Sequence, residues 1–330
     1  EDAVGWLWCD DASARTPAVS ERCKRAAVDM VDVLLGAAGR PGSRARVDVA
    51  AEAKVPMISV AASAKIVEPV DDKRRWVFKT PQNDALMAGA LADAMAKSKV
   101  KTLGFIGFAD AYGDGWLDVM QKAAKAKGIE IVSIEKYSRT DTSVTGQVLK
   151  LIGAKPDAIL IAGAGTPSAL PQKELKARNY GGTIYQTHGA ANNDVLRVCG
   201  KDCDGMYLPA GPLLVAAQLP DSNPVKKSAL AYVETYEKAN GAGSTNTFGG
   251  HMWDAGQLVV AALPAALKTG AKPGTPEFRA AMRDALENVK DLAASQGVFN
   301  MSPTDHAGFD ERSRVIVKVE GGKWVYQPGL

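Results

Sequence analysis

The sequence has few aromatic residues, little excess of either charge and no long hydrophobic run. Phe, Trp and Tyr make up only 6% of the 330 residues, which disfavours a platform of stacked aromatic side chains. The 40 Lys and Arg residues oppose 37 Asp and Glu, for a formal net charge of +3, whereas a nucleic-acid-binding domain is usually strongly basic. No stretch approaches the ~18 uncharged apolar residues of a membrane-spanning helix. We therefore expect neither a nucleic-acid partner nor a membrane span.

Signatures of catalysis and of cofactor binding are also missing. The sequence contains no G-x-x-x-x-G-K-[ST], no G-x-S-x-G and no H-E-x-x-H. Gly163-Ala164-Gly165 follows an apolar run, but Ser168 stands where the dinucleotide fingerprint needs its third glycine. The three histidines, His188, His251 and His306, are too scattered to predict one metal site. We expect no enzyme activity, no cofactor and no metal.

Cysteine is scarce, with four residues: Cys9, Cys23, Cys199 and Cys203. The last two stand in a C-x3-C spacing, which leaves a disulfide, free thiols or a weak zinc site open. A disulfide would place the protein in an oxidising compartment. The sequence opens at Glu1 without a signal peptide, so we expect either a cytosolic protein or a removed leader.

Short apolar runs alternate with segments of helical apolar spacing along the chain. The expected strands are 31–35, 55–60, 102–108, 129–134, 157–162, 183–186, 314–320 and 323–326. The expected helices are 83–97, 113–127, 142–152, 167–178, 225–240, 247–267 and 276–288, with Asp141 as a cap for the third. This alternation predicts an α/β protein with parallel sheets covered on both faces, and the last two strands predict a hairpin turned at Gly321-Gly322. The length favours two domains.

The ends of the expected strands are rich in small residues. These ends read 36–39, 61–63, 109–112, 162–166 and 188–189. Parallel sheets bind ligands at the carboxyl ends of their strands, where backbone N–H groups at helix starts can hold an anion. The pattern therefore predicts a ligand cleft, although small residues also serve simply to permit tight turns.

Eight segments, in this order and spacing, resemble the periplasmic solute-binding proteins of ABC importers, type I, of the branched-chain amino-acid kind. The matching segments are DDAS (10–13), VDVLLG (31–36), EAKVPMISVAAS (52–63), VFKTPQND (77–84), DAYGDGW (110–116), 154–182, YQTHGAANND (185–194) and FGGHMWDAG (248–256). The resemblance spans nearly the whole chain, but the family's first strand and helix have no counterpart here and residues 14–30 match poorly.

The resemblance implies two Rossmann-like lobes joined by three crossovers, with a ligand closed between them. The first lobe would hold 1–79 and 211–309, and the second 80–210 and 310–330. It further implies a periplasmic or lipid-anchored monomer whose leader has been removed and which delivers its ligand to a membrane permease. In that compartment, Cys199 and Cys203 are expected to form a disulfide.

The resemblance also assigns a set of ligand-binding residues. A carboxylate would be held in the first lobe by backbone N–H groups and hydroxyls of the loop Ala38-Gly39-Arg40 and of Ala61-Ala62-Ser63. The Arg40 side chain would either pair with the carboxylate or point into solvent, and solvent is slightly favoured. In the second lobe, Tyr112 would line the pocket, and Ala164 and Gly165 would widen it. The remaining ligand-binding residues would be Thr166, His188 and Gly189.

His188 stands where amino-acid binders of this family carry an acidic residue against the ligand ammonium. A histidine is a poor partner for an ammonium, and a buried unpaired ammonium is costly. We therefore expect a small carboxylate without an α-amino group, either an aromatic acid or a 2-oxo acid. The alternatives are a branched-chain or other amino acid and, on the same fold, a ligand-sensing regulator.

Overall fold

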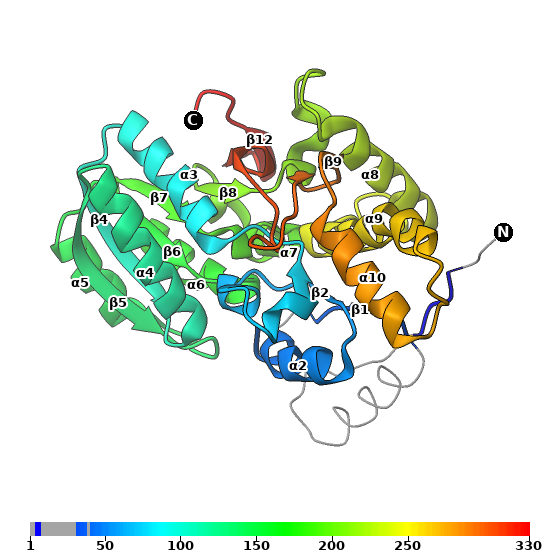
Figure 1. The fold of residues 1–330 in the computed structure, drawn as a ribbon. Helices are drawn as coiled ribbons and strands as arrows, with labels where there is room; N and C mark the ends of the chain where they lie inside the picture. The colour runs from blue at the N-terminus through cyan, green and yellow to red at the C-terminus, as the bar shows by residue number, and fades with distance from the viewer. Residues whose placement is uncertain (1–3, 8–30, 38–39) are drawn as a thin grey trace. The chain divides into compact units, whose positions relative to one another are not determined.

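The computed structural model describes residues 4–7, 31–37 and 40–330 (Figure 1). Contacts divide the chain into two compact units. Unit 1 comprises Glu1–Pro81, Phe248–Ala294 and Val298–Phe309, as far as it is described, and unit 2 comprises Gln82–Thr247, Ser295–Gly297 and Asp310–Leu330. No helix in the described ranges is long and apolar enough to cross a membrane.

Unit 2 is built on a seven-stranded sheet in the order β12-β11-β8-β7-β6-β4-β5. Its strands are β4 Thr102–Phe108, β5 Glu130–Tyr137, β6 Ala158–Ala162, β7 Thr183–Gln186, β8 Tyr207–Ala210, β11 Val315–Glu320 and β12 Lys323–Tyr326. The five strands from β8 to β5 run parallel, and β11 and β12 add an antiparallel edge. All five residues of β6 are buried, as expected for a parallel strand covered on both faces.

Unit 2 contains helices that cover both faces of this sheet and helices that pack beside it. They are α3 Asp84–Lys97, α4 Ala111–Ala126, α5 Thr145–Gly153, α6 Ala169–Ala177, α7 Asn193–Cys199 and α8 Lys226–Asn240. Helices α3 and α4 pack together on one face, and α5 packs with α6 on the other (Figure 1). In α4 the fully buried Trp116, Met120 and Ala124 recur every fourth residue, which is the period of one helix face. Burying a side chain of the size of Met120 stabilises the fold by about 1.5–3 kcal/mol.

Unit 1 carries a smaller parallel sheet in the order β1-β2-β3. Its strands are β1 Leu34–Leu35, β2 Met57–Ser59 and β3 Val77–Lys79, and its helices are α2 Arg40–Ala53, α9 Thr247–Lys268, which begins on the last residue of a unit 2 segment, and α10 Pro276–Glu287. A separate antiparallel pair joins β9 Leu292–Ala293 to β10 Val298–Phe299. Met57 packs on the α2 side of the sheet, and its neighbour Ile58 packs with α9 and α10. Adjacent residues of one strand thus bury opposite faces.

The α/β class expected from the sequence is confirmed, and most elements lie within a few residues of their predicted bounds. The hairpin β11–β12 pairs Glu320 with Lys323 around Gly321 and Gly322, which both adopt positive φ, as this turn requires. Asp141 was predicted to cap α5, but that helix begins at Thr145 after Val144, which makes no side-chain cap. The Asp141 carboxylate instead accepts a hydrogen bond from the backbone N–H of Ser138 at 2.8 Å, so it closes a turn before the helix.

Residues 211–247 group with unit 2, whereas the lobe bounds expected from the resemblance placed them in the first lobe. Helix α8 packs on the 3-10 segment Pro212–Gln218, which also packs on β12. Gln218 donates a hydrogen bond to the carbonyl of Trp324 and accepts one from the N–H of Tyr326. These contacts with the edge strand hold the segment to the larger sheet.

Candidate functional site

Three neighbouring parallel strands of unit 2 end at one edge of the sheet. Strand β4 lies beside β6, and β6 lies beside β7. Tyr112 stands in the first turn of α4, just after β4; residues 163–166 follow β6; and residues 187–189 follow β7. The structure therefore brings together the second-lobe residues assigned from the sequence, at the edge where parallel sheets bind ligands.

Thr187, which the sequence analysis missed, links these loops. Its hydroxyl donates to the carbonyl of Gly163 at 2.7 Å, and it lies 2.7 Å from the hydroxyl of Tyr112. Because the single proton of Thr187 goes to Gly163, the phenol of Tyr112 is the donor in the second bond.

Close packing between the loops leaves no room for a side chain at Gly163 or Gly189. A Cβ on Gly189 would lie 2.4 Å from the Tyr112 hydroxyl and 2.8 Å from Cβ of Ala164. A Cβ on Gly163 would lie 2.6 Å from the Tyr137 hydroxyl, and the N–H of Gly165 donates to the carbonyl of Gly189 at 2.9 Å. At Gly163 and Gly189 the small residue thus permits loops to touch, which is the alternative that the sequence left open.

His188 lies in a cluster with an acid and an indole. Its Nε2 is 3.9 Å from Oδ1 of Asp84, the first residue of α3, and both side chains are nearly buried. The ring of Trp116 packs against the His188 ring, with centroids 5.5 Å apart. Neither Asp84 nor Trp116 was singled out from the sequence, although each stands in a segment that carries the family resemblance.

Arg139 lies over the aromatic residues at the end of β4. Its guanidinium stacks 4.1 Å above the Phe108 ring and 5.9 Å from the Tyr112 ring, and its Nε lies 2.7 Å from Oδ2 of Asp110. Burial raises the pKa of Asp110, but hydrogen bonds from Arg139 and from the backbone N–H groups of Tyr112 and Gly113 outweigh it and hold the pKa below its usual value. Asp110 therefore serves as an ionised N-cap for α4.

The buried phenol of Tyr137 packs beneath the loop that follows β6. Burial raises the pKa of Tyr137, so its hydroxyl stays protonated across the physiological range. It donates to the carbonyl of Pro167 at 3.3 Å, and its ring packs against Phe108 with centroids 5.0 Å apart. Tyr137 thus supports the loop that follows β6.

The first-lobe candidates lie in unit 1. Ala61, Ala62 and Ser63 follow β2, and the N–H of Ala61 donates to Oγ of Ser59 at 3.1 Å. Ser63 precedes a 3-10 turn, Ala64–Ile66, and its side chain makes no cap hydrogen bond to it. Arg40 is the first residue of α2, while Ala38 and Gly39 lie outside the described residues, as do Cys9, Cys23 and the segment 10–13.

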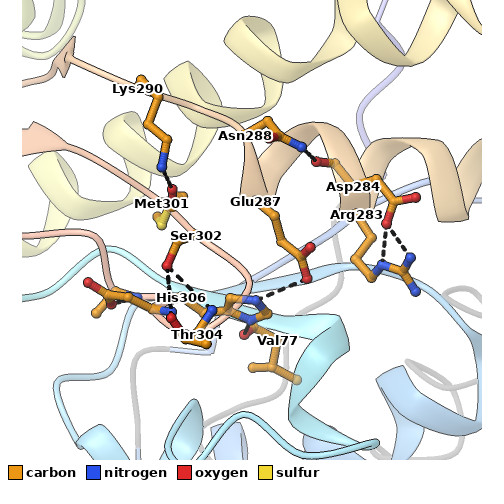
Figure 2. A network of polar contacts seen from close by, with 12 residues as sticks. Val77, Arg283, Asp284, Glu287, Asn288, Lys290, Met301, Ser302, Thr304 and His306 are labelled. Carbon is orange, nitrogen blue, oxygen red and sulfur yellow. Dashed lines mark hydrogen bonds and ion pairs between the residues drawn. The ribbon is translucent and has the colours of Figure 1, made fainter.

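His306 has a structural environment of its own in unit 1 (Figure 2). Its Nδ1 lies 2.9 Å from the carbonyl of Val77 and its Nε2 lies 3.2 Å from Oε1 of Glu287. The ring stacks on Phe78 at 4.1 Å and is almost fully buried. This arrangement ties the segment before Ala307 to β3 and α10, so His306 has a structural role. Within the described ranges, no three His, Cys, Asp or Glu side chains cluster as metal ligands do.

Cys199 and Cys203 are joined by a disulfide in the structure, with Cα atoms 5.5 Å apart. The pair closes a short loop at the end of α7, and both residues are buried in the core of unit 2. That the pair is oxidised in the protein remains a prediction, which thiol labelling of the folded protein would test.

Comparison with known proteins places these features in context. The family described as periplasmic binding protein matches residues 3–323. An extracellular ligand-binding receptor from Rhodopseudomonas palustris is 45% identical with a TM-score of 0.89, over 96% of this chain and 88% of that one. A second such receptor from that organism is 42% identical with a TM-score of 0.87, over 95% and 87%. No curated protein matches.

More distant structures share the fold. A leucine binding protein from Thermotoga maritima is 19% identical with a TM-score of 0.78, over 97% of this chain and 85% of that one. An ABC transporter substrate-binding protein from Desulfitobacterium hafniense, solved in complex with Leu, is 18% identical with a TM-score of 0.73, over 95% and 86%. At such identities the likeness concerns the fold alone.

Proposed function

The chain belongs to the type I periplasmic binding proteins of the branched-chain amino-acid kind, and we propose that it captures a small carboxylate without an α-amino group for an ABC importer. The family consists of ligand-binding receptors, not enzymes, and homologues of this chain are extracellular receptors. The proposed ligand is an aromatic or 2-oxo acid, held between two lobes that close about a hinge and passed to a membrane permease. The protein acts outside the cytoplasmic membrane.

The proposed ligand class rests on the presence of a histidine at position 188. In unit 2, His188 lies at the carboxyl edge of the sheet, beside the Trp116 ring and within 3.9 Å of Asp84. An imidazole can donate a hydrogen bond to a ligand carbonyl or hydroxyl, whereas it offers an ammonium at most one acceptor. Desolvating an ammonium against such a partner is unfavourable.

Asp84 supports the rival ligand class. Its carboxylate, next to His188, is an anion that an amino-acid ligand would need, and the leucine-binding relatives bind an amino acid on this fold. The carboxylate hypothesis and the amino-acid hypothesis give Asp84 different roles. If it faces the ligand ammonium, Asp84→Asn weakens amino-acid binding strongly; if it orients His188, the same variant weakens carboxylate binding as His188→Ala does.

A thermal-shift screen of amino acids, 2-oxo acids and aromatic acids tests the proposed function. A ligand at 100 times its Kd adds about 2.7 kcal/mol of apparent stability, which shifts Tm by several degrees. We expect stabilisation by an aromatic or 2-oxo acid at concentrations where the matching amino acid has no effect. Stabilisation by amino acids alone would contradict the proposed ligand class.

A further inference from the structure

Unit 2 is assembled from three separate segments of chain, and a buried polar side chain stands near each junction. Gln82 is the first residue of the first segment and Thr247 is its last, Gln296 is the centre of the three-residue segment Ser295–Gly297, and Ser313 belongs to the third segment. All four residues are buried, Gln296 and Ser313 completely. Buried amides and hydroxyls are retained where hydrogen bonds satisfy them.

Hydrogen bonds from the two glutamines join these segments. Nε2 of Gln82 donates to the carbonyl of Ser313 at 2.8 Å and to the carbonyl of Gln296 at 3.2 Å. Nε2 of Gln296 donates to the carbonyl of Thr247 at 3.0 Å. The two protons of the Gln82 amide thus bind the second and third segments of unit 2. Gln296, in the second segment, binds the end of the first segment.

The same chain of bonds reaches the loop that carries His188. The hydroxyl of Thr247 donates to the carbonyl of Ala191 at 3.1 Å, and the N–H of Ala191 donates to the carbonyl of His188 at 3.1 Å. At its other end, Gln82 stands two residues before Asp84, whose carboxylate lies beside His188. Both members of the His188–Asp84 pair are therefore anchored next to this chain of bonds.

The two amides occupy the space that a side chain at Gly211 would need. A Cβ at this position would lie 1.9 Å from Oε1 of Gln296 and 2.9 Å from Nε2 of Gln82. Gly211 has an extended backbone, with φ −68° and ψ 149°, which any residue adopts. The absence of a side chain therefore reflects the space taken by the amides and not a special backbone conformation.

We propose that Gln82, Gln296 and Thr247 form a buried relay of hydrogen bonds that positions the His188 loop for ligand binding. The inference rests on the proposed function, because it concerns the same ligand site. These three are positioning residues, and they act through the carbonyl of Ala191 and the backbone beside Asp84.

The variants Thr247→Val and Thr247→Ser test the relay. Valine keeps the shape but removes the hydroxyl, and serine restores it. Losing one hydrogen bond of ordinary strength predicts a roughly 2- to 12-fold rise in Kd for the tightest 2-oxo or aromatic acid from the screen. Serine should return the Kd to within about twofold of wild type. A role confined to stability would instead lower Tm for Thr247→Val and leave Kd and the preference for oxo acids unchanged, and that result would overturn the proposal.

Hydrogen exchange of the ligand-free protein gives a second readout that does not depend on the ligand. Thr247→Val should accelerate exchange at the amides of Ala190 and Ala191, while amides in β4 and β6 keep their wild-type protection. Equal protection of the loop in both proteins would contradict the relay even where Kd changes.

Gly211→Ala breaks the relay at a distance from His188, and Gly146→Ala is its matched control. A Cβ on Gly146 meets nothing within 4 Å, so we expect wild-type Kd for this variant and a raised Kd for Gly211→Ala. Equal affinities would overturn the relay and leave the proposed function intact. Failure of wild-type protein to bind any carboxylate would overturn the proposed function and, with it, this inference.

Discussion

Asp110 shows how a single residue serves both an element and the candidate site. Its carboxylate accepts hydrogen bonds from the N–H groups of Tyr112 and Gly113 and pairs with Arg139. Because Asp110 caps α4, the helix begins at Ala111 and Tyr112 lies in its first turn, next to the strand ends. Local chemistry of this kind is visible in the sequence, because an Asp directly before a helix is a common start signal.

Asp110→Asn should make the free energy of unfolding change less as the pH falls into the acidic range. The folded pKa of Asp110 lies below its unfolded value, so its charge stabilises the fold above about pH 4 and this contribution is lost as pH falls through the folded pKa. Asparagine still caps the helix, so the variant removes only the charge. Because the carboxylate is partly exposed, we expect a loss of less than about 1 kcal/mol at pH 7.

The free energy of unfolding of both proteins in urea, measured at pH 7 and at pH 3, checks this prediction. The difference between them should shrink at pH 3. A difference of the same size at both pH values would show that the charge of Asp110 does not stabilise the fold.

His306→Phe should destabilise unit 1 without affecting the candidate ligand site in unit 2. Phenylalanine retains the stacking on Phe78 but leaves the carbonyl of Val77 and the carboxylate of Glu287 without the imidazole (Figure 2). Leaving such buried groups unsatisfied costs about 1–3 kcal/mol each. Chemical denaturation measures the loss, and a variant as stable as wild type would contradict the structural role given to His306.

The sequence did not predict which residues far apart along the chain contact each other. Thr187 follows a predicted strand and Asp84 lies in the first turn of a predicted helix. Nothing in a linear pattern indicates that Thr187 contacts Tyr112 or that Asp84 contacts His188. These contacts join residues 75 and 104 positions apart, counted from 112 to 187 and from 84 to 188. They depend on which strands are neighbours in the sheet.

Most strands and helices were predicted because their patterns are local, although α2, β3 and β8 were not. Apolar runs such as Thr102–Phe108 and Thr183–Gln186 coincide with β4 and β7. The packing of the connecting loops was not predictable in the same way. Small residues at strand ends were interpreted as room for a ligand, yet the loops around Gly163 and Gly189 pack against each other.

Gly189→Ala should disturb this loop packing. The added methyl group would meet the Tyr112 hydroxyl and Cβ of Ala164, and overpacking of this kind typically costs about 1–3 kcal/mol. The matched control is Gly181→Ala, where a Cβ meets nothing within 4 Å. Thermal unfolding of the two variants should separate them by several degrees, and equal Tm values would show that the loops yield without cost.

The loop closed by Cys199 and Cys203 gives a further prediction at this scale. A disulfide across so short a loop stabilises by about 2 kcal/mol in the chain-entropy description, so the double variant Cys199→Ala/Cys203→Ala should lose about that much. Thiol labelling of the folded protein without reductant, with peptides mapped by mass spectrometry, decides whether the bond exists. Labelling of both cysteines would reject it.

At the scale of the whole molecule, the family was recognisable because its segments keep their order along nearly the whole chain. The bounds of the two lobes remain an expectation from the resemblance, and the contact grouping of the structure differs from them for residues 211–247. The grouping of residues 211–247 depends on contacts of Gln218 with β12, a strand that lies about a hundred residues later in the sequence. Such a contact fixes the assignment only once the sheet is formed.

The central claim is that a carboxylate lacking an α-amino group binds better than its amino-acid analogue because His188 faces it. If Asp84 orients His188 and does not face the ligand, an ammonium against the imidazole loses water without gaining an anion, at about 1–3 kcal/mol, which corresponds to roughly 5- to 150-fold in Kd. His188→Glu supplies an anion and should narrow or invert this preference.

Calorimetry of wild-type protein with phenylpyruvate against phenylalanine, and with 4-methyl-2-oxopentanoate against leucine, tests the claim most directly. We expect the oxo acid of at least one pair to bind more tightly by this factor. Tighter binding of both amino acids would contradict the account and would point to Asp84, beside His188, as the partner of the ammonium.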